Sequence, residues 1–481
     1  MSSPHFSSPR GEDAETSVDT RLTRRQLAVA TMTVLLNMLA VINFRSLGAA
    51  MAEIARDVGA GPAHELWFPD AFLTALIVAT PISAHLVRRW GPHRVLVGCI
   101  SGSVVASVLT SAANDTYTLA GLLFFQGLFA GPIAPTTQAV IVSHFPAQRR
   151  GTGMAIWNAG ATFGVLAGSL AGGYLTELYN WRILFLLAVP LGALSYGFVA
   201  KVLPHQGGSA DVETDWRSIL LLAGGLTALG AAVNLTDDVA VIGAGTIVSL
   251  AAAAIIALGL FHVFNERSTA PILNLRVLSD HQLASTVAII LGASALNFGL
   301  LETEALTEIM GFDAETVGIT NAIRAMAFLG GVAAGARLVD VGFRRGLVLL
   351  ALALIAAGKL GTTLYGADTG FFGATWPPVL SQAGLGMVGT GLAVFAFETV
   401  APALIAAAAS VFVFSRVFGN AIGLAAANTA RSLREGQLVA AGEVHAAAAQ
   451  ASFFEVFWVG IVLTLLLMPL AWRLRDAPRS A

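Results

Sequence analysis

Long apolar stretches alternate with short polar stretches along almost the whole chain. A helix needs about 20 apolar residues to cross a bilayer core, and roughly fourteen stretches reach that length. They lie near residues 27–50, 67–87, 95–113, 117–143, 152–175, 181–203, 217–235, 240–264, 282–306, 316–338, 346–364, 376–399, 404–429 and 453–473. This pattern predicts an all-α polytopic membrane protein with about 14 spans.

The order of the stretches predicts two halves of six helices separated by an inserted pair. We expect a first bundle over 26–203, a linker over 204–216, the inserted pair over 217–265 and a second bundle over 282–474. Residues 1–25 and 475–481 are expected to be cytoplasmic tails, and the composition of the first tail is typical of disorder. The alanine-rich segment from Ser432 to Gln450 is interpreted as an outer loop with a short helix over the outer mouth.

Arginine and lysine residues set the expected orientation, because positively charged loops stay in the cytoplasm. If the N-terminus is cytoplasmic, about nineteen of these residues fall in inner segments and only four fall in outer loops. The bias predicts an even number of spans with both termini in the cytoplasm. The first apolar run is longer than the core of a signal peptide, so we expect an uncleaved helix.

Composition excludes several other classes of protein. Hydrophobic residues make up 56% of the 481 residues and charged residues 12%, and the mean hydropathy is +0.74; a soluble domain could not keep such a surface in water. No basic patch indicates nucleic-acid binding, and the one cysteine, Cys99, excludes a disulfide within the chain. We find no ATP-binding loop motif and no metal-ligand spacing of histidines, so neither an enzyme nor a bound cofactor is expected.

Five glycines mark the segment around which the first half is organised. Gly160, Gly164 and Gly168 are spaced by four residues, and Gly172 and Gly173 follow. Each step of four overshoots a helical turn by only about 40°, so the glycines stay on one stripe. The stripe predicts a close approach of another helix, backbone to backbone, as membrane helices require.

The residues around this stripe carry a resemblance to a known family. The order Ala155-x8-Gly164-x3-Gly168-Ser169-x2-Gly172-Gly173 resembles the fifth-helix antiporter motif of the major facilitator superfamily, with Ser169 where that motif has proline. Gln126-Gly127 with Gly131, Arg149-Arg150-Gly151 and Trp181-Arg182 resemble the neighbouring helices and loop. The similarity is to fourteen-spanner drug/proton antiporters of the EmrB/QacA kind. It implies a monomer in the bacterial inner membrane, with a small-molecule substrate and protons, and with a periplasmic adaptor as a candidate partner.

The two halves repeat one another. Ala84-x-Leu86-x-Arg88-Arg89-x-Gly91 has a counterpart in Gly335-x-Arg337-Leu338-x-Asp340-x-Gly342, and Gly164-x3-Gly168 has a looser one in Gly419-x3-Gly423. Repeats of this kind place the substrate between the bundles near the midplane. The motifs 84–91 and 335–342 follow the second and tenth spans and so lie in cytoplasmic loops. We therefore expect cytoplasmic-loop gating by Arg88, Arg89, Gly91, Arg94 and Asp340.

Charged residues within spans cost about 2.5–3.5 kcal/mol at the helix centre on insertion scales, so each one needs a reason. The candidates are Arg45, Asp70, Glu302, Glu304, Arg324, Lys359, Glu398 and Arg416. Arg45 is expected near Asp70, and Glu302 and Glu304 near Arg324. Glu302 is our first choice for a proton-carrying carboxylate, with a locking ion pair and an interfacial position as alternatives. Lys359 and Glu398 lie near span ends and are expected to snorkel; Arg416 has no partner that the sequence identifies.

Uncharged polar residues in the spans are candidates for substrate contacts or for hydrogen bonds between helices. Asn43, Gln126, Gln138 and Asn158 lie in the first half, and Asn297, Asn321, Gln382 and Asn420 in the second. Trp157, Phe163 and Phe298 are candidates for an aromatic wall, with packing or contact with lipid as the alternative.

Three departures from the family pattern fall in the first half: Asn43 replaces an acid, Arg88 an aspartate and Leu123 an arginine. If substrate transport is coupled to protons, we expect the coupling residues to be Glu302, Glu304 and Arg324. The leading hypothesis is proton-driven export of small hydrophobic compounds. The alternatives are a transporter of anionic metabolites that uses Arg45 and Arg324, and a receptor-like derivative that does not transport.

Overall fold

The computed structural model describes residues 22–61, 67–146, 149–205, 207–209, 213–234, 244–268, 271–366, 368–398 and 400–474. Every regular element within these ranges is a helix. The predicted C-terminal tail lies outside them, as does the predicted N-terminal tail up to residue 21. The end of that tail belongs instead to the first helix, which starts at Arg24 because Thr23 and Gln26 form a capping box.

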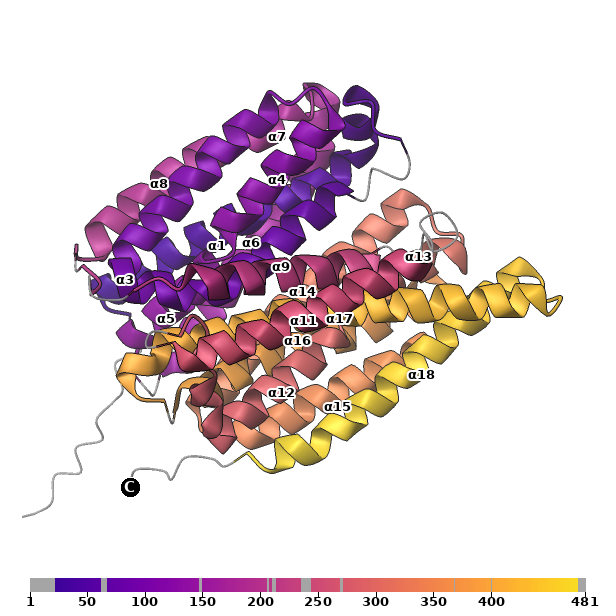
Figure 1. Cartoon of the computed structure of the whole chain (residues 1–481). Coiled ribbons are helices and arrows are strands. Elements are labelled where there is room, and N and C mark those ends of the chain that lie inside the picture. The colour runs from indigo at the N-terminus through magenta and orange to yellow at the C-terminus, as the bar shows by residue number, and fades with distance from the viewer. Residues whose placement is uncertain are drawn as a thin grey trace, which may run out of the picture.

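The first half of the chain forms one bundle (Figure 1). Its helices are α1 (Arg24–Asp57), α3 (Trp67–Ser111), α4 (Thr116–Ala130), α5 (Ile133–His144), α6 (Arg150–Leu178), α7 (Arg182–Leu186) and α8 (Ala188–Val202). The α3 helix includes two predicted spans, which join at a non-helical residue, Gly91, with φ 78° and ψ 157°. Glycine suits this position because a side chain disfavours positive φ.

The second half forms the other bundle. Its elements are η2 (Leu275–Ser279), α12 (His281–Ala295), α13 (Gly299–Glu308), α14 (Ala314–Asp340), α15 (Arg344–Thr362), α16 (Phe371–Glu398), η3 (Pro402–Leu404), α17 (Ile405–Ala440) and α18 (His445–Trp472). The interpretation of 432–450 as a loop with a short helix over the outer mouth is wrong. Instead α17 continues to Ala440, α18 begins at His445, and the pair projects beyond the neighbouring helices (Figure 1).

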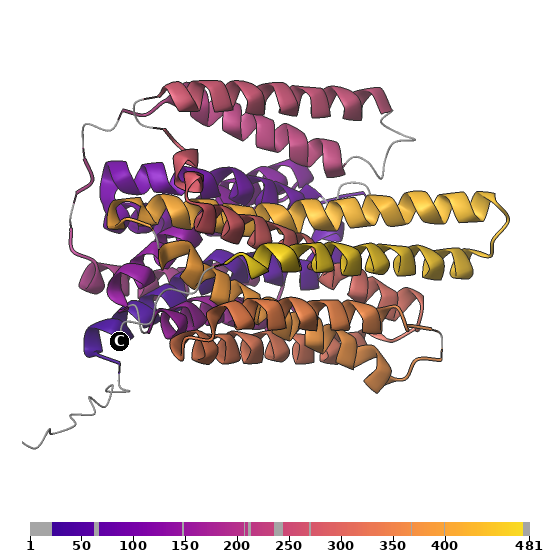
Figure 2. The same cartoon turned by 90° about the horizontal axis from the view of Figure 1, so that it is seen from below.

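The inserted helices α9 (Trp216–Asn234) and α11 (Ala244–Arg267) pack on each other at the side of the molecule (Figure 2). They touch the rest of the protein mainly through α9, which contacts α3 and α17. In the part of the chain that is described, eleven helices are long and apolar enough to cross a membrane. Because α3 is one of these and α9 and α12 are shorter apolar helices, the predicted count of fourteen spans stays a prediction.

Each bundle has a seam of small residues at which two of its helices pack closely, as the glycine stripe predicts. An ideal Cβ on Gly164 would lie 3.0 Å from the Met38 Cα atom, and one on Gly168 would lie 2.5 Å from the Ile42 carbonyl oxygen. The α6 helix therefore packs directly on the backbone of α1. The stripe's last residue, Gly173, has no described surroundings.

The second bundle repeats this seam. A Cβ on Gly419 would lie 2.4 Å from the Leu291 carbonyl oxygen, and one on Gly423 would lie 2.0 Å from that of Ala295. The α17 helix thus packs on α12 as α6 packs on α1. The looser repeat noted in the sequence has the same structural role.

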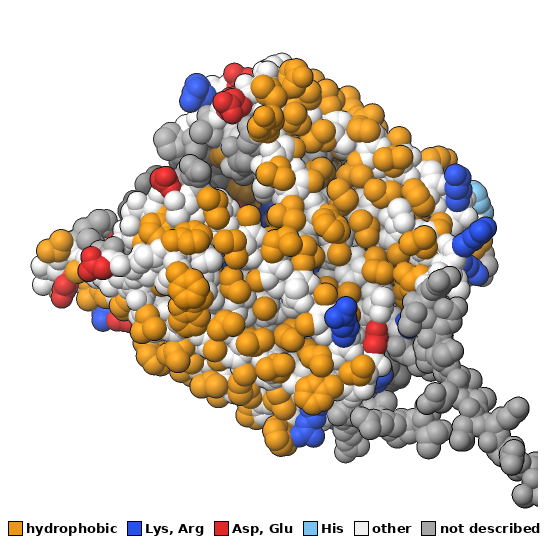
Figure 3. All heavy atoms as spheres, turned by 180° about the vertical axis from the view of Figure 1, so that it is seen from behind, with side chains coloured by type: hydrophobic (Ala, Val, Ile, Leu, Met, Phe, Trp, Pro, Cys, Tyr) orange, Lys and Arg blue, Asp and Glu red, His pale blue; other side chains and the backbone are white. Residues whose placement is uncertain are grey.

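The two bundles converge at the end of the molecule that holds the described ends of the chain and spread apart at the other end (Figure 1). From behind, the surface is hollowed between them at that far end (Figure 3).

At the rim of the first bundle, Asp57 accepts hydrogen bonds from the Trp181 indole at 2.9 Å and the Arg182 guanidinium at 2.6 Å. These two bonds hold the pKa of Asp57 below its ordinary value.

Candidate functional site

The apolar stretch that begins the second bundle is broken in the middle. Residues 296–298 separate α12 from α13 and are not helical. The Asn297 side chain lies at the break, donating to Asn420 Oδ1 at 3.0 Å and accepting from Gln382 Nε2 at 3.3 Å. Discontinuous helices at the midplane are typical of substrate and ion sites in transporters, because they free backbone groups for ligands.

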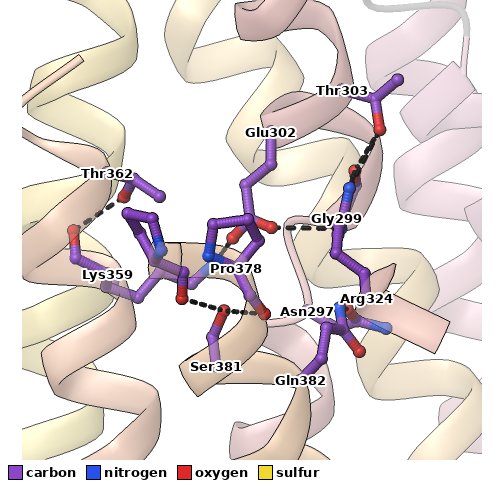
Figure 4. Close-up of polar contacts among 12 residues, drawn as sticks. Asn297, Gly299, Glu302, Thr303, Arg324, Lys359, Thr362, Pro378, Ser381 and Gln382 are labelled. Carbon is purple, nitrogen blue, oxygen red and sulfur yellow. Dashed lines mark hydrogen bonds and ion pairs between the residues drawn. The ribbon is translucent and has the colours of Figure 1, made fainter. Parts of the chain in front are cut away.

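A cluster of three charged side chains lies next to this break (Figure 4). Glu302, in the first turn of α13, places Oε1 2.6 Å from Lys359 Nζ on α15 and Oε2 3.1 Å from a guanidinium nitrogen of Arg324 on α14. Their side chains are between 1% and 7% exposed. We call Glu302, Arg324 and Lys359 the buried charge cluster; its formal charge is +1.

Each cation has further contacts that offset the cost of its burial. Arg324 donates to the Gly299 carbonyl oxygen at 3.1 Å, to Thr303 at 3.1 Å and to Asn321 at 2.8 Å. The Lys359 ammonium lies 4.5 Å from the centre of the Phe298 ring, which favours a desolvated cation. The expectation that Lys359 snorkels is therefore wrong, because its side chain is 1% exposed and points into the bundle.

The two oxygens of Glu302 differ. Oε1 accepts a hydrogen bond from Lys359, whereas Oε2 is buried and accepts no hydrogen bond although Arg324 is close. Of the alternatives for Glu302, the ion pair is therefore formed and the interfacial position is wrong. Its role in carrying a proton is not tested by this geometry.

Glu304 does not join the cluster. Its Oε2 lies 3.5 Å from Arg431 on α17, which also pairs with Glu308 at 2.9 Å. These pairs tie α13 to α17. Glu398, the other residue that was expected to snorkel, forms an ion pair with Arg344.

Two of the predicted polar residues of the first bundle, Asn43 and Gln126, meet at Ser107, which the sequence pattern does not single out. Asn43 Nδ2 donates to Ser107 Oγ at 2.6 Å, and Gln126 Nε2 donates to the same oxygen at 2.5 Å. Arg45 and Asp70 are both described, and the expected ion pair between them is not formed. The Arg45 guanidinium lies 5.6 Å from the Phe44 ring and has no hydrogen-bond acceptor among the described residues, and its Cβ faces Gly168 of α6.

Arg416 bridges the two bundles. From α17 it donates to Asn158 Oδ1 at 3.2 Å and lies 4.9 Å from the Trp157 ring, both on α6. Nearby, Ser410 donates to the carbonyl oxygens of Thr80 and Pro81 at 3.2 and 3.0 Å. These contacts lie on the converging side of the molecule, so the structure is closed there.

Asp340 joins the two bundles at the closed end. From the end of α14 it accepts hydrogen bonds from the Gly151 amide at 3.1 Å and the Thr152 hydroxyl at 2.6 Å. Because Arg149 provides no side-chain cap of its own, a carboxylate of the second bundle caps the N-terminus of α6 in the first.

The arginines that were expected to gate the same end contact the linkers of the inserted helices instead. Arg88 donates to the Pro271 carbonyl oxygen and Arg89 to Thr214, while the Arg88 carbonyl oxygen accepts from the Ser209 amide at 3.0 Å. Arg94 is exposed. The hydrogen bonds of Asp340, in contrast, cross between the bundles.

Asp340→Ala is expected to weaken the closed end by about 1 kcal/mol, the usual value of a helix cap. A cysteine placed at the buried inter-bundle position Ser410 should then react faster with a water-soluble thiol reagent. Asp313→Ala is the matched control, because Asp313 caps α14 within its own bundle by accepting from Thr316 at 2.9 Å. Equal labelling rates in both variants would show that the Asp340 cap does not hold this end closed.

Comparisons with known proteins agree with this architecture. The family model described as Major Facilitator Superfamily matches residues 33–424. The chain is 24% identical to the fatty acid resistance protein FarB of Neisseria gonorrhoeae over 82% of its length and 78% of that protein. It is 24% identical to the probable multidrug resistance protein EmrY of Escherichia coli over 57% of its length, an alignment that spans 54% of EmrY.

Among solved structures, the human organic anion transporter MFSD10 aligns with a TM-score of 0.65 and 15% identity over 93% of this chain and 99% of that one. This likeness shows the fold. Together with the family match and the multidrug resistance relatives, it confirms the resemblance on which the sequence was interpreted. The chain belongs to the major facilitator superfamily, in its drug/proton antiporter branch, and is a secondary active membrane transporter.

Proposed function

We propose that this transporter exports small, mostly hydrophobic compounds in exchange for protons, and that Glu302 is the carboxylate that couples the two movements. The observation that supports this most strongly is the buried charge cluster beside the break between α12 and α13. Transport by alternating access requires groups whose interactions differ between the two states. A carboxylate held by two cations from different helices meets this requirement.

The electrostatics of the cluster link proton uptake to movement. A proton on Glu302 raises the formal charge of the cluster from +1 to +2 and leaves Lys359 and Arg324 without a counter-ion. Buried cations without a partner are costly, so protonation favours a state in which water or substrate reaches them. Oε2 is the oxygen proposed to receive the proton: it accepts no hydrogen bond, and its 3.1 Å ion-pair contact with Arg324 is the interaction that protonation gives up.

The arrangement of the bundles indicates which state is described. The described ends of the chain lie at the closed end (Figure 1), and the positive-inside bias favours a cytoplasmic location for that end. We therefore assign the hollow between the bundles to the outer side of a bacterial inner membrane. The transporter is proposed to act as a monomer without cofactor or catalytic step, with a periplasmic adaptor as a candidate partner.

Flux measurements in proteoliposomes test the coupling role. Glu302→Gln is expected to abolish substrate flux driven by a pH gradient while leaving substrate binding and exchange at equal pH in place. Glu304→Gln is the matched control, because it lies two residues away and pairs with Arg431 outside the cluster. Unchanged pH-driven flux in Glu302→Gln would remove this residue from the mechanism.

A second candidate function, export of organic anions, is favoured by the excess of cations. The cluster is formally +1 and Arg45 has no acceptor within the described residues. Competition between a lipophilic cation and a hydrophobic carboxylate for the same flux separates the two. Inhibition by the carboxylate alone, lost in Arg45→Gln, would favour the anion; absence of any flux from folded protein would instead indicate a receptor-like derivative.

A further inference from the structure

An apolar groove of ≈ 470 Å³ opens on the second bundle between α12, α17 and α18. Its size falls in the range of about 300–1,000 Å³ that is typical of ligand pockets. The groove exists because the floor is built from small residues: Gly292 and Ala295 on α12, and Gly423, Ala426 and Ala430 on α17. In Figure 1, α17 and α18 converge toward their connection and spread apart away from it.

The surroundings of the groove define the kind of occupant. The walls include Val459 and Leu466, which are 56% and 65% exposed and lie on membrane-spanning helices. Water is therefore not the expected filling, and a hydrocarbon chain from the bilayer can reach the groove without crossing the protein.

The mouth of the groove adds a polar requirement. Arg434 Nε lies 2.9 Å from both carboxylate oxygens of Glu455, and the two side chains are 41% and 52% exposed. A phosphate binds an arginine well, and a primary ammonium can donate to a glutamate. A head group with a net negative charge would place that charge beside Glu455, and a choline head group has no N–H to donate.

The inner end of the groove reaches the buried charge cluster through one aromatic ring. Phe298 lines the groove and also lies 4.5 Å from the Lys359 ammonium. The ring also packs on Gly460, where a Cβ would lie 2.9 Å from it. A chain lodged in the groove therefore presses on the residue that covers the cation.

We propose that this groove binds a membrane phospholipid whose head group holds a phosphate and a primary amine, with one acyl chain along the small-residue floor and the head group at Arg434 and Glu455. Through Phe298, the bound lipid supports the position of Lys359. The site is separate from the hollow between the bundles, and its existence does not depend on the transported substrate or on proton coupling.

Photolabelling of the full chain in liposomes tests the proposal. Three probes carry the same photoreactive acyl chain with a phosphoethanolamine, a phosphocholine or a phosphoglycerol head group. The first is expected to label residues 422–434 and 452–467 about fivefold more than the others do, as a half-exposed charge contact allows. Ala426→Phe should remove this labelling because the new ring fills the groove.

Two controls complete the experiment. Ala253→Phe adds the same ring to an exposed position on α11 and should leave the labelling intact. Glu455→Gln should remove the preference for the amine while the groove is still labelled. Equal labelling by all three probes, or labelling that survives Ala426→Phe, would mean that ordinary boundary lipid is present and would overturn the proposal, as would groove labelling by a free fatty acid in place of the phospholipids.

Discussion

A Glu302→Leu variant is expected to be less stable than the natural chain by about 3–5 kcal/mol, the cost of leaving buried charge without its partner. The substitution removes the only negative charge of the cluster and leaves Lys359 and Arg324 within the same bundle, each nearly inaccessible. Arg324 keeps its contacts to Gly299, Thr303 and Asn321. Among the described residues Lys359 has no comparable set of hydrogen-bond acceptors, so most of the loss is expected at Lys359.

Thermal or denaturant unfolding of the purified protein in detergent measures this loss. Adding Lys359→Leu to Glu302→Leu should recover most of the stability, since the charge without a partner is then gone. Glu304→Leu on the same helix is the control and should cost no more than about 1 kcal/mol, because its pair is partly exposed. A double variant that is no more stable than Glu302→Leu would show that the pair is not what stabilises this region.

A Gly423→Leu variant is expected to lose most of its folded protein. A Cβ at this position would lie only 2.0 Å from the Ala295 carbonyl oxygen, which belongs to helix backbone and cannot move as a side chain does. Overpacking of a well-packed interior costs about 1–3 kcal/mol and more where backbone must shift. The α12 and α17 helices would have to separate beside the break that positions Glu302.

The yield of monodisperse protein on size-exclusion chromatography reports this effect. Gly436→Leu on the same helix is the matched control, because a Cβ there meets no atom within 4 Å. It should behave like the natural chain. Similar yields from the two variants would contradict the account of the seam between α12 and α17.

The sequence was informative where a pattern lies along one helix. The glycine stripe predicts a backbone contact, and the structure has that contact between α6 and α1. The repeated Gly-x3-Gly predicts an equivalent in the second half, which is also present. Both predictions depend only on helical periodicity, which the sequence determines directly.

The sequence was less informative about which helices become neighbours. Its apolar runs give the approximate depth of a charge, and Lys359 was assigned to a span end on that basis. The side chain instead reaches Glu302 on α13 inside the bundle, a neighbour in space that no local pattern encodes. Arg45 and Asp70 are separated by a short connection, yet Arg45 faces α6. Proximity along the chain does not fix the direction in which helical side chains point.

Distances between the bundles test alternating access most directly. The single cysteine, Cys99, is buried, so spin labels can be placed on introduced cysteines. Tyr117 and Phe372 report on the spread end, and Trp90 and Val341 on the closed end; all four are exposed. If the bundles rock about a shared site, lowering the pH or adding substrate shortens the first distance while it lengthens the second. Two distances that stay fixed, or that change in the same direction, would contradict the account.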